Sequence, residues 1–271
     1  MLNDITIGQF FPGDSVIHRC DPRVKFVLIF AYIVMIFVSH NYVGLFITAA
    51  IIFLIMFLSK ISFKTYLKSL KPIIPIVIFT SVLNIFYVQG ENILIDAGWF
   101  KISLEGIETA GLLIIRICCL LLISSVLTYT TSPTDLTDAM ERLMKPLKYI
   151  KVPVHELSMM MTIALRFVPT LIEETDKIMS AQKARGADMD SGGLIKRVKA
   201  LVPVLIPLFV SSFRRAYELA LAMECRCYKG GEGRTRMKIL HIKRNDIIII
   251  LLLFIIFAGV IITNIYFEPI I

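Results

Sequence analysis

Charged residues are scarce in this sequence. Asp, Glu, Lys and Arg together make up 18% of the 271 residues, whereas hydrophobic residues make up 56% and the mean hydropathy is +0.76. This composition excludes an ordinary water-soluble protein and indicates a polytopic integral membrane protein. The net charge of +8 is compatible with a nucleic-acid partner, but so apolar a chain is expected to place its basic residues in cytoplasmic loops, so no nucleic acid is expected.

Motifs for disulfides, metals and nucleotides are also lacking. The cysteines form neither a disulfide framework nor a paired CxxC pattern, and we expect free thiols at Cys20, Cys118, Cys119, Cys225 and Cys227. His155-Glu156 lacks the second histidine of a zinc protease because Met159 occupies that position. No GxxxxGK[ST] phosphate loop occurs either. We therefore expect no catalytic residues, no metal and no cofactor.

Long apolar runs are what the sequence does contain. A bilayer core about 30 Å thick needs about 20 mostly apolar residues in a helix, and five runs come close. They cover residues 24–38, 42–58, 72–87, 107–129 and 247–267. Pro72 and Pro75 predict an irregular entry into the short third run. No basic stretch and cleavage site precede the first run, so we expect that run to remain as an anchor.

The basic residues predict how the chain is oriented. Lysines and arginines gather before the first run and between the second and third, whereas the loop at 88–106 has Lys101 against three acidic residues. Because basic loops stay in the cytoplasm, we expect a cytoplasmic N-terminus and an outside C-terminus. The chain then divides into transmembrane helices at 1–130, a cytoplasmic module at 131–245 and a last transmembrane helix at 246–271.

The cytoplasmic module begins with a well-marked amphipathic helix. Ser132 can cap it, Pro133 suits its first position and Asp135 complements its dipole. Apolar residues then recur at helical spacing up to a break near Pro146, and they include Leu136, Met140, Leu143 and Met144. Pattern alone favours a helix packed on its neighbours at the membrane surface over a helix that binds a partner.

Two long helical patterns follow, at 154–184 and 194–228, and both change from apolar to charged along their length. A shift of forty-one positions aligns their ends and superimposes Arg185 on Arg226. The first ends at Gly186 and the second before Gly230. We expect two helices that leave the membrane region, each with an arginine at its far cytoplasmic tip. These arginines either neutralise the helix dipole or dock on carboxylates of a partner.

At these residues the chain resembles the transmembrane T component of energy-coupling factor (ECF) transporters, the EcfT or CbiQ-like family. The phrase Ala164-Leu165-Arg166-Phe167-Val168-Pro169 and the intact motif Ala184-Arg185-Gly186 are typical of that family. The second motif keeps Glu224 and Arg226 but has Cys225 and Cys227 where alanine and glycine are commonest. The resemblance covers nearly the whole chain and is strongest from Thr131 to Arg236.

The resemblance implies a non-catalytic scaffold in the plasma membrane of a prokaryote. In the family, the T component joins two cytoplasmic ABC-type ATPases to a membrane S component that captures a vitamin or a metal ion. The residues implied to dock the ATPases are Ala184, Arg185, Gly186, Glu224 and Arg226. The residues implied to form a platform under the S component are Leu136, Met140, Leu143, Met144, Met159, Met160 and Met161. An adaptable methionine surface would suit several S components in turn.

Arg116 lies inside the fourth apolar run, where a charge is usually paired or faces a cavity. An ion pair with Glu108 and a role in transport are both compatible with this position.

Two other classes of membrane protein fit the sequence less well. A membrane enzyme acting on lipids lacks a qualifying group of polar residues, and a substrate-binding membrane protein lacks polar groups to line a pocket.

Overall fold

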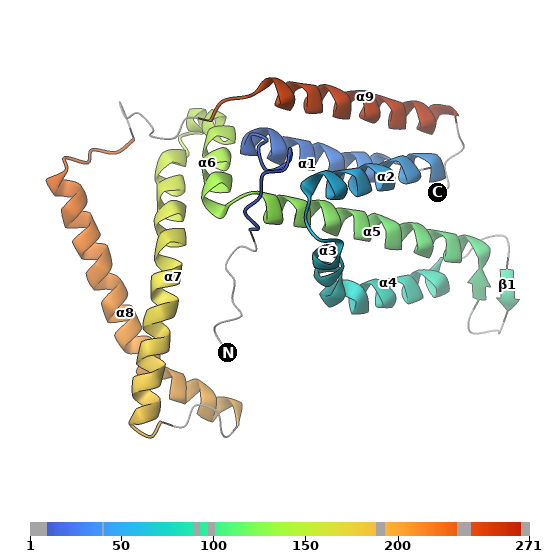
Figure 1. The fold of residues 1–271 in the computed structure, drawn as a ribbon. Coiled ribbons are helices and arrows are strands. Elements are labelled where there is room, and N and C mark those ends of the chain that lie inside the picture. Colours follow the sequence, from blue (N-terminus) through green and yellow to red (C-terminus); the bar gives the residue numbers. More distant parts are fainter. Residues whose placement is uncertain are drawn as a thin grey trace. The chain divides into compact units, whose positions relative to one another are not determined.

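The computed structural model describes residues 10–39, 41–88, 93–96, 101–187, 193–231 and 240–266. The described chain is helical apart from one β-hairpin and divides into two compact units (Figure 1). The core unit consists of Gly8–Ala139 and Ile239–Ile271, and the long-helix unit is built on Met140–Lys238.

The core unit contains six helices among its described residues. These are α1 (Pro22–Val38), α2 (Tyr42–Ser59), α3 (Phe63–Leu70), α4 (Ile74–Tyr87), α5 (Leu104–Thr130) and α9 (Arg244–Tyr266). The 3₁₀ turn η1 (Lys71–Ile73) joins α3 to α4 at the two expected prolines. Helix α6 (Pro133–Leu143) crosses the boundary between the units, and η2 (Lys145–Ile150), α7 (Val154–Ala184) and α8 (Leu194–Cys225) belong to the long-helix unit.

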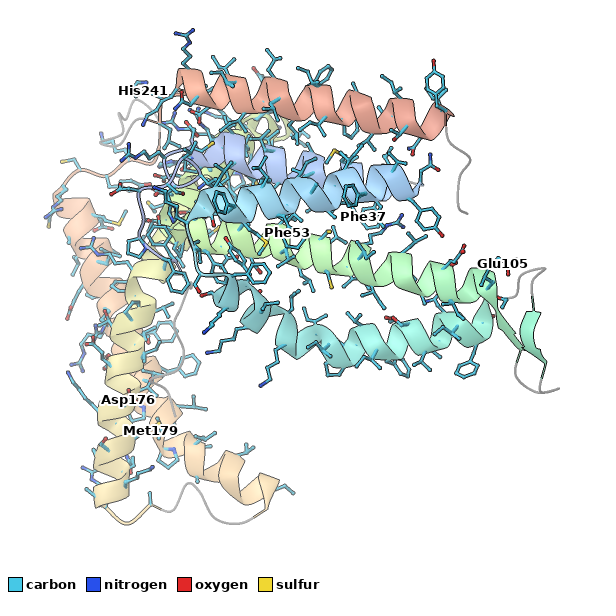
Figure 2. The ribbon with its side chains drawn as sticks, turned by 45° about the vertical axis from the view of Figure 1, so that its right-hand side comes forward. Phe37, Phe53, Glu105, Asp176, Met179 and His241 are labelled. Atoms are coloured by element: carbon cyan, nitrogen blue, oxygen red, sulfur yellow. The ribbon has the colours of Figure 1, made fainter. Side chains whose placement is uncertain are left out.

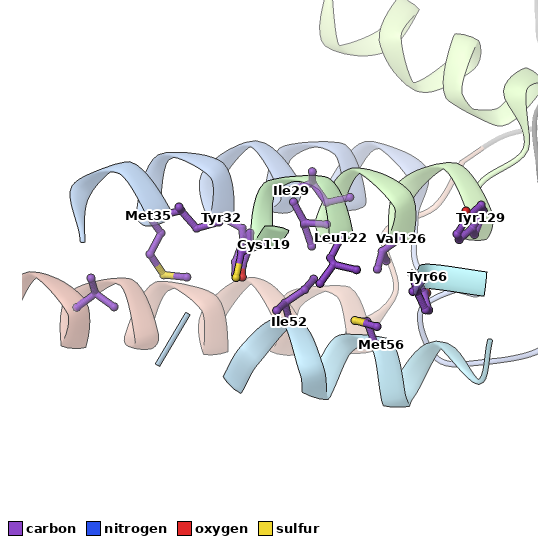
Figure 3. Packing of buried hydrophobic residues seen from close by; sticks show 13 residues of the cluster. Ile29, Tyr32, Met35, Ile52, Met56, Tyr66, Cys119, Leu122, Val126 and Tyr129 are labelled. Carbon is purple, nitrogen blue, oxygen red and sulfur yellow. The ribbon is translucent and has the colours of Figure 1, made fainter. Parts of the chain in front are cut away.

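Buried apolar side chains from several helices hold the core unit together (Figure 3). The cluster includes Tyr32 of α1, Ile52 of α2 and Ile123 of α5, each at most 2% exposed. Its buried hydroxyls are satisfied, because Tyr32 donates to the Thr48 carbonyl at 2.8 Å and Tyr66 of α3 lies 2.9 Å from Ser59 Oγ. These two contacts join α1 to α2 and α2 to α3 within the core unit.

Charged groups join three helix ends at one end of the core unit. The Lys25 ammonium, which is buried, donates to the Thr130 carbonyl at 3.0 Å and to Thr131 Oγ1 at 2.9 Å, linking α1 to the end of α5. The buried Asp246 carboxylate accepts the backbone N–H groups of Asp21 at 3.3 Å and Lys243 at 2.8 Å, linking α1 to the start of α9. The start of α1, the end of α5 and the start of α9 therefore lie on the same side.

Five helical stretches of the described chain are long and apolar enough to cross a membrane. They are 42–59, 63–87, 104–130, 198–225 and 244–266. Their number matches the five runs predicted from the sequence, but the two sets differ in one member. Helix α1 has 17 residues and is too short for this count, whereas 198–225, which we expected in the cytoplasmic module, is included. Several apolar stretches of sufficient length indicate a multi-pass membrane protein.

A β-hairpin between α4 and α5 was not expected from the sequence, which predicted a loop there. Strand β1 (Ile93–Asp96) pairs antiparallel with β2 (Lys101–Ser103), and Asp96 lies opposite Lys101. Strands of four and three residues are too short for a reliable alternating pattern. Ser103 then caps α5 by accepting the Gly106 N–H at 3.1 Å. The prediction of an all-α protein is therefore correct except for this hairpin.

Arg116 donates a hydrogen bond at the end of α1 and does not form an ion pair with Glu108. Its Nη2 donates to the Ser39 carbonyl at 2.9 Å, just past the last residue of α1, and no ion pair joins it to Glu108. Asn264 of α9 donates to the Val38 carbonyl at the same helix end at 2.6 Å. A cation beside the carbonyls at a helix C-terminus is stabilising. Of the two roles left open for Arg116, this geometry favours a structural one.

All five cysteines are free, as the sequence predicted. Cys20 is buried just before α1, whereas Cys225 and Cys227 are exposed. Burial, followed by a hydrogen bond to Asp246, raises the pKa of the Cys20 thiol to about 12. Cys20 therefore stays protonated and unreactive at neutral pH.

Candidate coupling site in the two long helices

Helices α7 and α8 form an antiparallel pair in the long-helix unit (Figure 1). Near the end of α7, Gln182 donates to the Pro203 carbonyl at 3.5 Å, and near the start of α7, Met159 Sδ accepts the Tyr228 hydroxyl at 3.1 Å. The end of α7 therefore lies beside Pro203, inside α8, and the end of α8 lies beside the first turns of α7. Both helices are close to the predicted ranges, with α8 ending three residues before the expected Tyr228.

Glu174 of α7 connects the two helices near their middle. Its carboxylate accepts from the Ser211 hydroxyl and from Arg215 Nη2, the latter at 2.5 Å. Sequence reasoning did not identify this contact, although one signal was present. Glu174 and Arg215 are forty-one positions apart, the same shift that aligns the two helix ends. Equivalent positions of the two helices therefore meet at this contact, as they would on an approximate two-fold axis.

The arginines Arg185 and Arg226 lie on opposite sides of this contact and are not brought together. Each follows its member of the Glu174–Arg215 pair by 11 residues (185 − 174 and 226 − 215). The helices run in opposite directions, so each arginine lies roughly 17 Å from the contact along its helix, at about 1.5 Å per residue. The two are thus on the order of 30 Å apart, too far to bind one carboxylate.

Both helices end in the same backbone motif. After α7, the N–H of Ala187 bonds to the Gln182 carbonyl and that of Gly186 to Lys183, both at 3.0 Å. After α8, the N–H of Tyr228 bonds to the Met223 carbonyl at 3.0 Å and that of Cys227 to Glu224 at 2.8 Å. This pair of bonds is the Schellman motif.

The residue after each arginine has a left-handed backbone, with φ of 85° at Gly186 and 55° at Cys227. Cys227 thus takes the conformation that glycine takes in the first motif. The cysteine in the second motif does not change the helix end, and Arg185 and Arg226 occupy equivalent capping positions.

The predicted docking residues are open to contact. Ala184, Arg185, Gly186, Glu224 and Arg226 are all exposed. Neither arginine forms an ion pair within the described part of the chain. An exposed guanidinium on a capped helix end can make two parallel hydrogen bonds to a carboxylate. Each end can therefore bind one acidic site on a partner.

The predicted platform residues are partly or fully exposed, and none is buried. Met160 and Met161 are 55% and 43% exposed, whereas Met159 is half-buried under Tyr228. Leu136, Met140, Leu143 and Met144 of the α6 region are half-buried. As predicted, Ser132 caps α6 by accepting the Asp135 N–H at 3.1 Å, and the chain passes into a 3₁₀ turn at Pro146.

Helix α8 exposes many apolar side chains, and of its described side chains only Val204 is buried. The exposed group includes Val198, Leu201, Val202, Leu205, Ile206, Phe209, Val210, Phe213, Tyr217 and Leu221. A continuous apolar surface of this size is typical of a contact with lipid or with another protein. The sequence predicted that the first half of this helix is apolar, and in the described chain these side chains are mostly exposed.

The segment after α8 packs on the beginning of α7. A Cβ atom at Gly231 would lie 2.2 Å from the His155 ring, so only glycine fits there without a shift. His155 Nδ1 lies 3.2 Å from Glu141 Oε1. Within the described ranges, no group of three or more His, Cys, Asp or Glu side chains could hold a metal ion. His155 therefore packs between Glu141 of α6 and the segment that follows α8.

Comparison with known proteins agrees with this architecture. The model of the CbiQ family, described as a cobalt transport protein, matches residues 13–238. The chain is 52% identical over 249 residues to the energy-coupling factor transporter transmembrane protein EcfT of Ruminiclostridium cellulolyticum, covering 92% of this chain and 93% of the relative.

Relatives of the same name from two other bacteria agree. The protein of Acidaminococcus fermentans is 49% identical, covering 95% of this chain and 97% of its own, and that of Bacillus subtilis is 47% identical, covering 88% and 90%. Matches of this extent include the long helices and both of their ends. The chain is therefore a multi-pass, non-catalytic membrane subunit and belongs to the EcfT or CbiQ-like family, the transmembrane T components of ECF transporters.

Proposed function

We propose that this T component is a scaffold that joins two ABC-type ATPases to a substrate-binding S component, with α7 and α8 transmitting movement between them. The symmetric placement of Arg185 and Arg226 around the Glu174–Arg215 contact carries the proposal. Two equivalent arginines on the order of 30 Å apart suit two equivalent acidic sites on two subunits related by a two-fold axis. Closure of the two ATPases would then move the helix ends relative to each other.

The S component would bind the exposed methionines and the apolar surface of α8. Met160, Met161 and Phe213 are unusually exposed for such apolar side chains, and lipid or a membrane partner would cover them. The family description, cobalt transport protein, supports a transition-metal ion as the substrate. A vitamin is the other class of substrate that the resemblance implies.

Adaptable methionine side chains would let one T component serve several S components. Replacing Met159, Met160 and Met161 with leucine tests this role, because leucine keeps the apolar character and removes the flexibility. We expect uptake to fall for some substrates and not for others. Unchanged uptake of every substrate would contradict a role in partner exchange.

The orientation we propose has the N-terminus in the cytoplasm and the C-terminus outside. The start of α1, the end of α5 and the start of α9 lie on one side of the core unit. With a cytoplasmic N-terminus, α9 therefore begins on the cytoplasmic side and ends outside. The basic residues Arg19, Arg23 and Arg244 lie near that side. In this orientation α8 lies on the cytoplasmic side and does not cross the membrane.

Copurification from native membranes tests the ATPase contacts. We compare the tagged wild type with the double variant Arg185→Glu and Arg226→Glu, and we identify companions by mass. Reversed charge repels a carboxylate, so we expect the variant to lose both ATPases and to retain the S component.

The matched control is Arg166→Glu with Arg214→Glu, which changes the same charges at exposed positions within α7 and α8. It should retain the ATPases. Equal recovery of ATPases by the tip variant and the wild type would show that the arginines are not the anchors. If the wild type brings down no ATPase, the scaffold proposal fails.

A further inference from the structure

A cavity in the core unit lies where α2 ends and α3 begins. Its volume is about 580 Å³, within the range of sites that hold a small organic molecule. Phe53, Met56, Phe57 and Leu58 of α2 contribute to its apolar wall, together with Phe63 and Tyr66 of α3. Phe53, labelled in Figure 2, stacks on Phe63 with ring centroids 6.2 Å apart, and this contact joins the two helices beside the cavity. The cavity can therefore hold an apolar chain.

The polar groups of this cavity are Lys60 and Ser62, in the turn between the helices. Lys60 is exposed and caps α2 with a left-handed backbone, φ 58°. Three more exposed lysines, Lys64, Lys68 and Lys71, follow at helical spacing on α3 and η1. The sequence from 60 to 71 contains no acidic residue, and within the described chain none of these lysines forms an ion pair.

This arrangement matches the structure of a membrane lipid. Helix α3 is strongly amphipathic and follows a transmembrane stretch, so its lysines belong at the level of the lipid headgroups. The exposed rings of Phe53 and Phe57 belong to the adjacent hydrocarbon. A soluble anion would not use the apolar wall, and an uncharged lipid would not use the lysines.

We propose that this cavity binds an anionic phospholipid, with an acyl chain between α2 and α3 and the phosphate at Lys60 and Lys64. Such a lipid would fix α3, which otherwise has Tyr66 as its one buried side chain, against the core unit. The bound lipid would thus hold in place the short, irregular segment through which the chain enters α4.

Native mass spectrometry of the full purified chain tests this site, with phosphatidylglycerol against phosphatidylcholine of the same acyl chains. We expect the wild type to retain phosphatidylglycerol preferentially. In Lys60→Gln with Lys64→Gln, affinity for phosphatidylglycerol should fall about 25-fold, since each lysine near an anionic lipid contributes roughly a fivefold factor. Lys148→Gln with Lys151→Gln, exposed lysines of the long-helix unit with the same charge change, should bind like the wild type.

Two results would overturn the proposal. Equal retention of the two lipids by the wild type would exclude a headgroup site, and equal losses in both lysine variants would reduce it to a general charge effect. Soluble glycerol phosphate tests whether the lysines bind a free phosphate and not a lipid, because it has the charge of the headgroup and lacks the acyl chains. It should not displace the bound lipid, and displacement at equal concentration would assign the lysines to a free phosphate.

Discussion

At the scale of single residues, each arginine caps its helix because the residue after it, Gly186 or Cys227, has a left-handed backbone. Gly186 has no Cβ, and its surroundings are empty within 4 Å, so only its backbone matters. Cys227 has the same role with a side chain, and L-residues are disfavoured in this region by roughly 1–2 kcal/mol. The second helix end is therefore built like the first but with some backbone strain.

Replacing Cys227 with glycine should relieve this strain. We expect the end of α8 to gain about 1 kcal/mol, which corresponds to about fivefold slower amide exchange at residues 227 and 228. Hydrogen exchange followed by mass spectrometry measures this change.

Cys225→Gly provides a control of opposite sign. Cys225 is the last helical residue of α8, where glycine is about 1 kcal/mol less favourable than a helix former, so exchange should become faster. Slower exchange in both variants would mean that loss of a thiol, and not backbone conformation, explains the result.

At the scale of elements, the long-helix pair depends on few contacts, because both helices are largely exposed. The Glu174 link to Ser211 and Arg215 is the polar connection near the middle. Its side chains are partly exposed, 21% for Glu174 and 35% for Arg215, so solvent screens the ion pair and limits its contribution.

A double-mutant cycle can measure this connection. We expect Glu174→Ala and Arg215→Ala to show a coupling energy of about 0.5–1 kcal/mol in the free energy of unfolding of the chain in detergent. Glu173→Ala removes the exposed neighbouring carboxylate and should show no coupling to Arg215→Ala. Additive effects in the Glu174 cycle would mean that α7 and α8 are held together by apolar contacts alone.

At the scale of the whole molecule, hydropathy and charge lead to different assignments for α8. The stretch 198–225 is long and apolar enough to span, yet the distribution of basic residues predicts that it stays on the cytoplasmic side. The antiparallel contact with α7 makes each assignment testable. The end of α8 lies beside the start of α7, so a spanning α8 would take its own first residues and the end of α7 to the outside.

Single cysteines in a cysteine-free chain resolve this question. We expect a membrane-impermeant maleimide to label Tyr87→Cys and Tyr266→Cys in intact cells, at the ends of α4 and α9, where the tyrosines are 89% and 81% exposed. Lys148→Cys and Ala184→Cys should be labelled only after the membrane is opened. Labelling of Ala184→Cys from outside would make α8 a transmembrane helix and would reverse the proposed placement of Arg185.

Local patterns in the sequence were sufficient to predict most of the helices and several of their ends, although α3 was not predicted. Ser132 as a cap, the break at Pro146, the range 154–184 of α7 and the left-handed Gly186 all depend on neighbours within a few residues, and the structure confirms them. The free cysteines and the membrane class follow from composition in the same way. The two strands of the hairpin were missed because each is too short to give a pattern.

What only the tertiary structure decided are the relations between residues far apart in the chain. The antiparallel register of α7 and α8 puts Glu174 on Arg215 and separates Arg185 from Arg226, whereas the sequence left both arginines simply at helix tips. Packing also gave Arg116 its partner at Ser39 and created the cavity beside Lys60. Periodicity records which face of a helix is apolar, but which helix covers that face depends on the contacts that form when the chain folds.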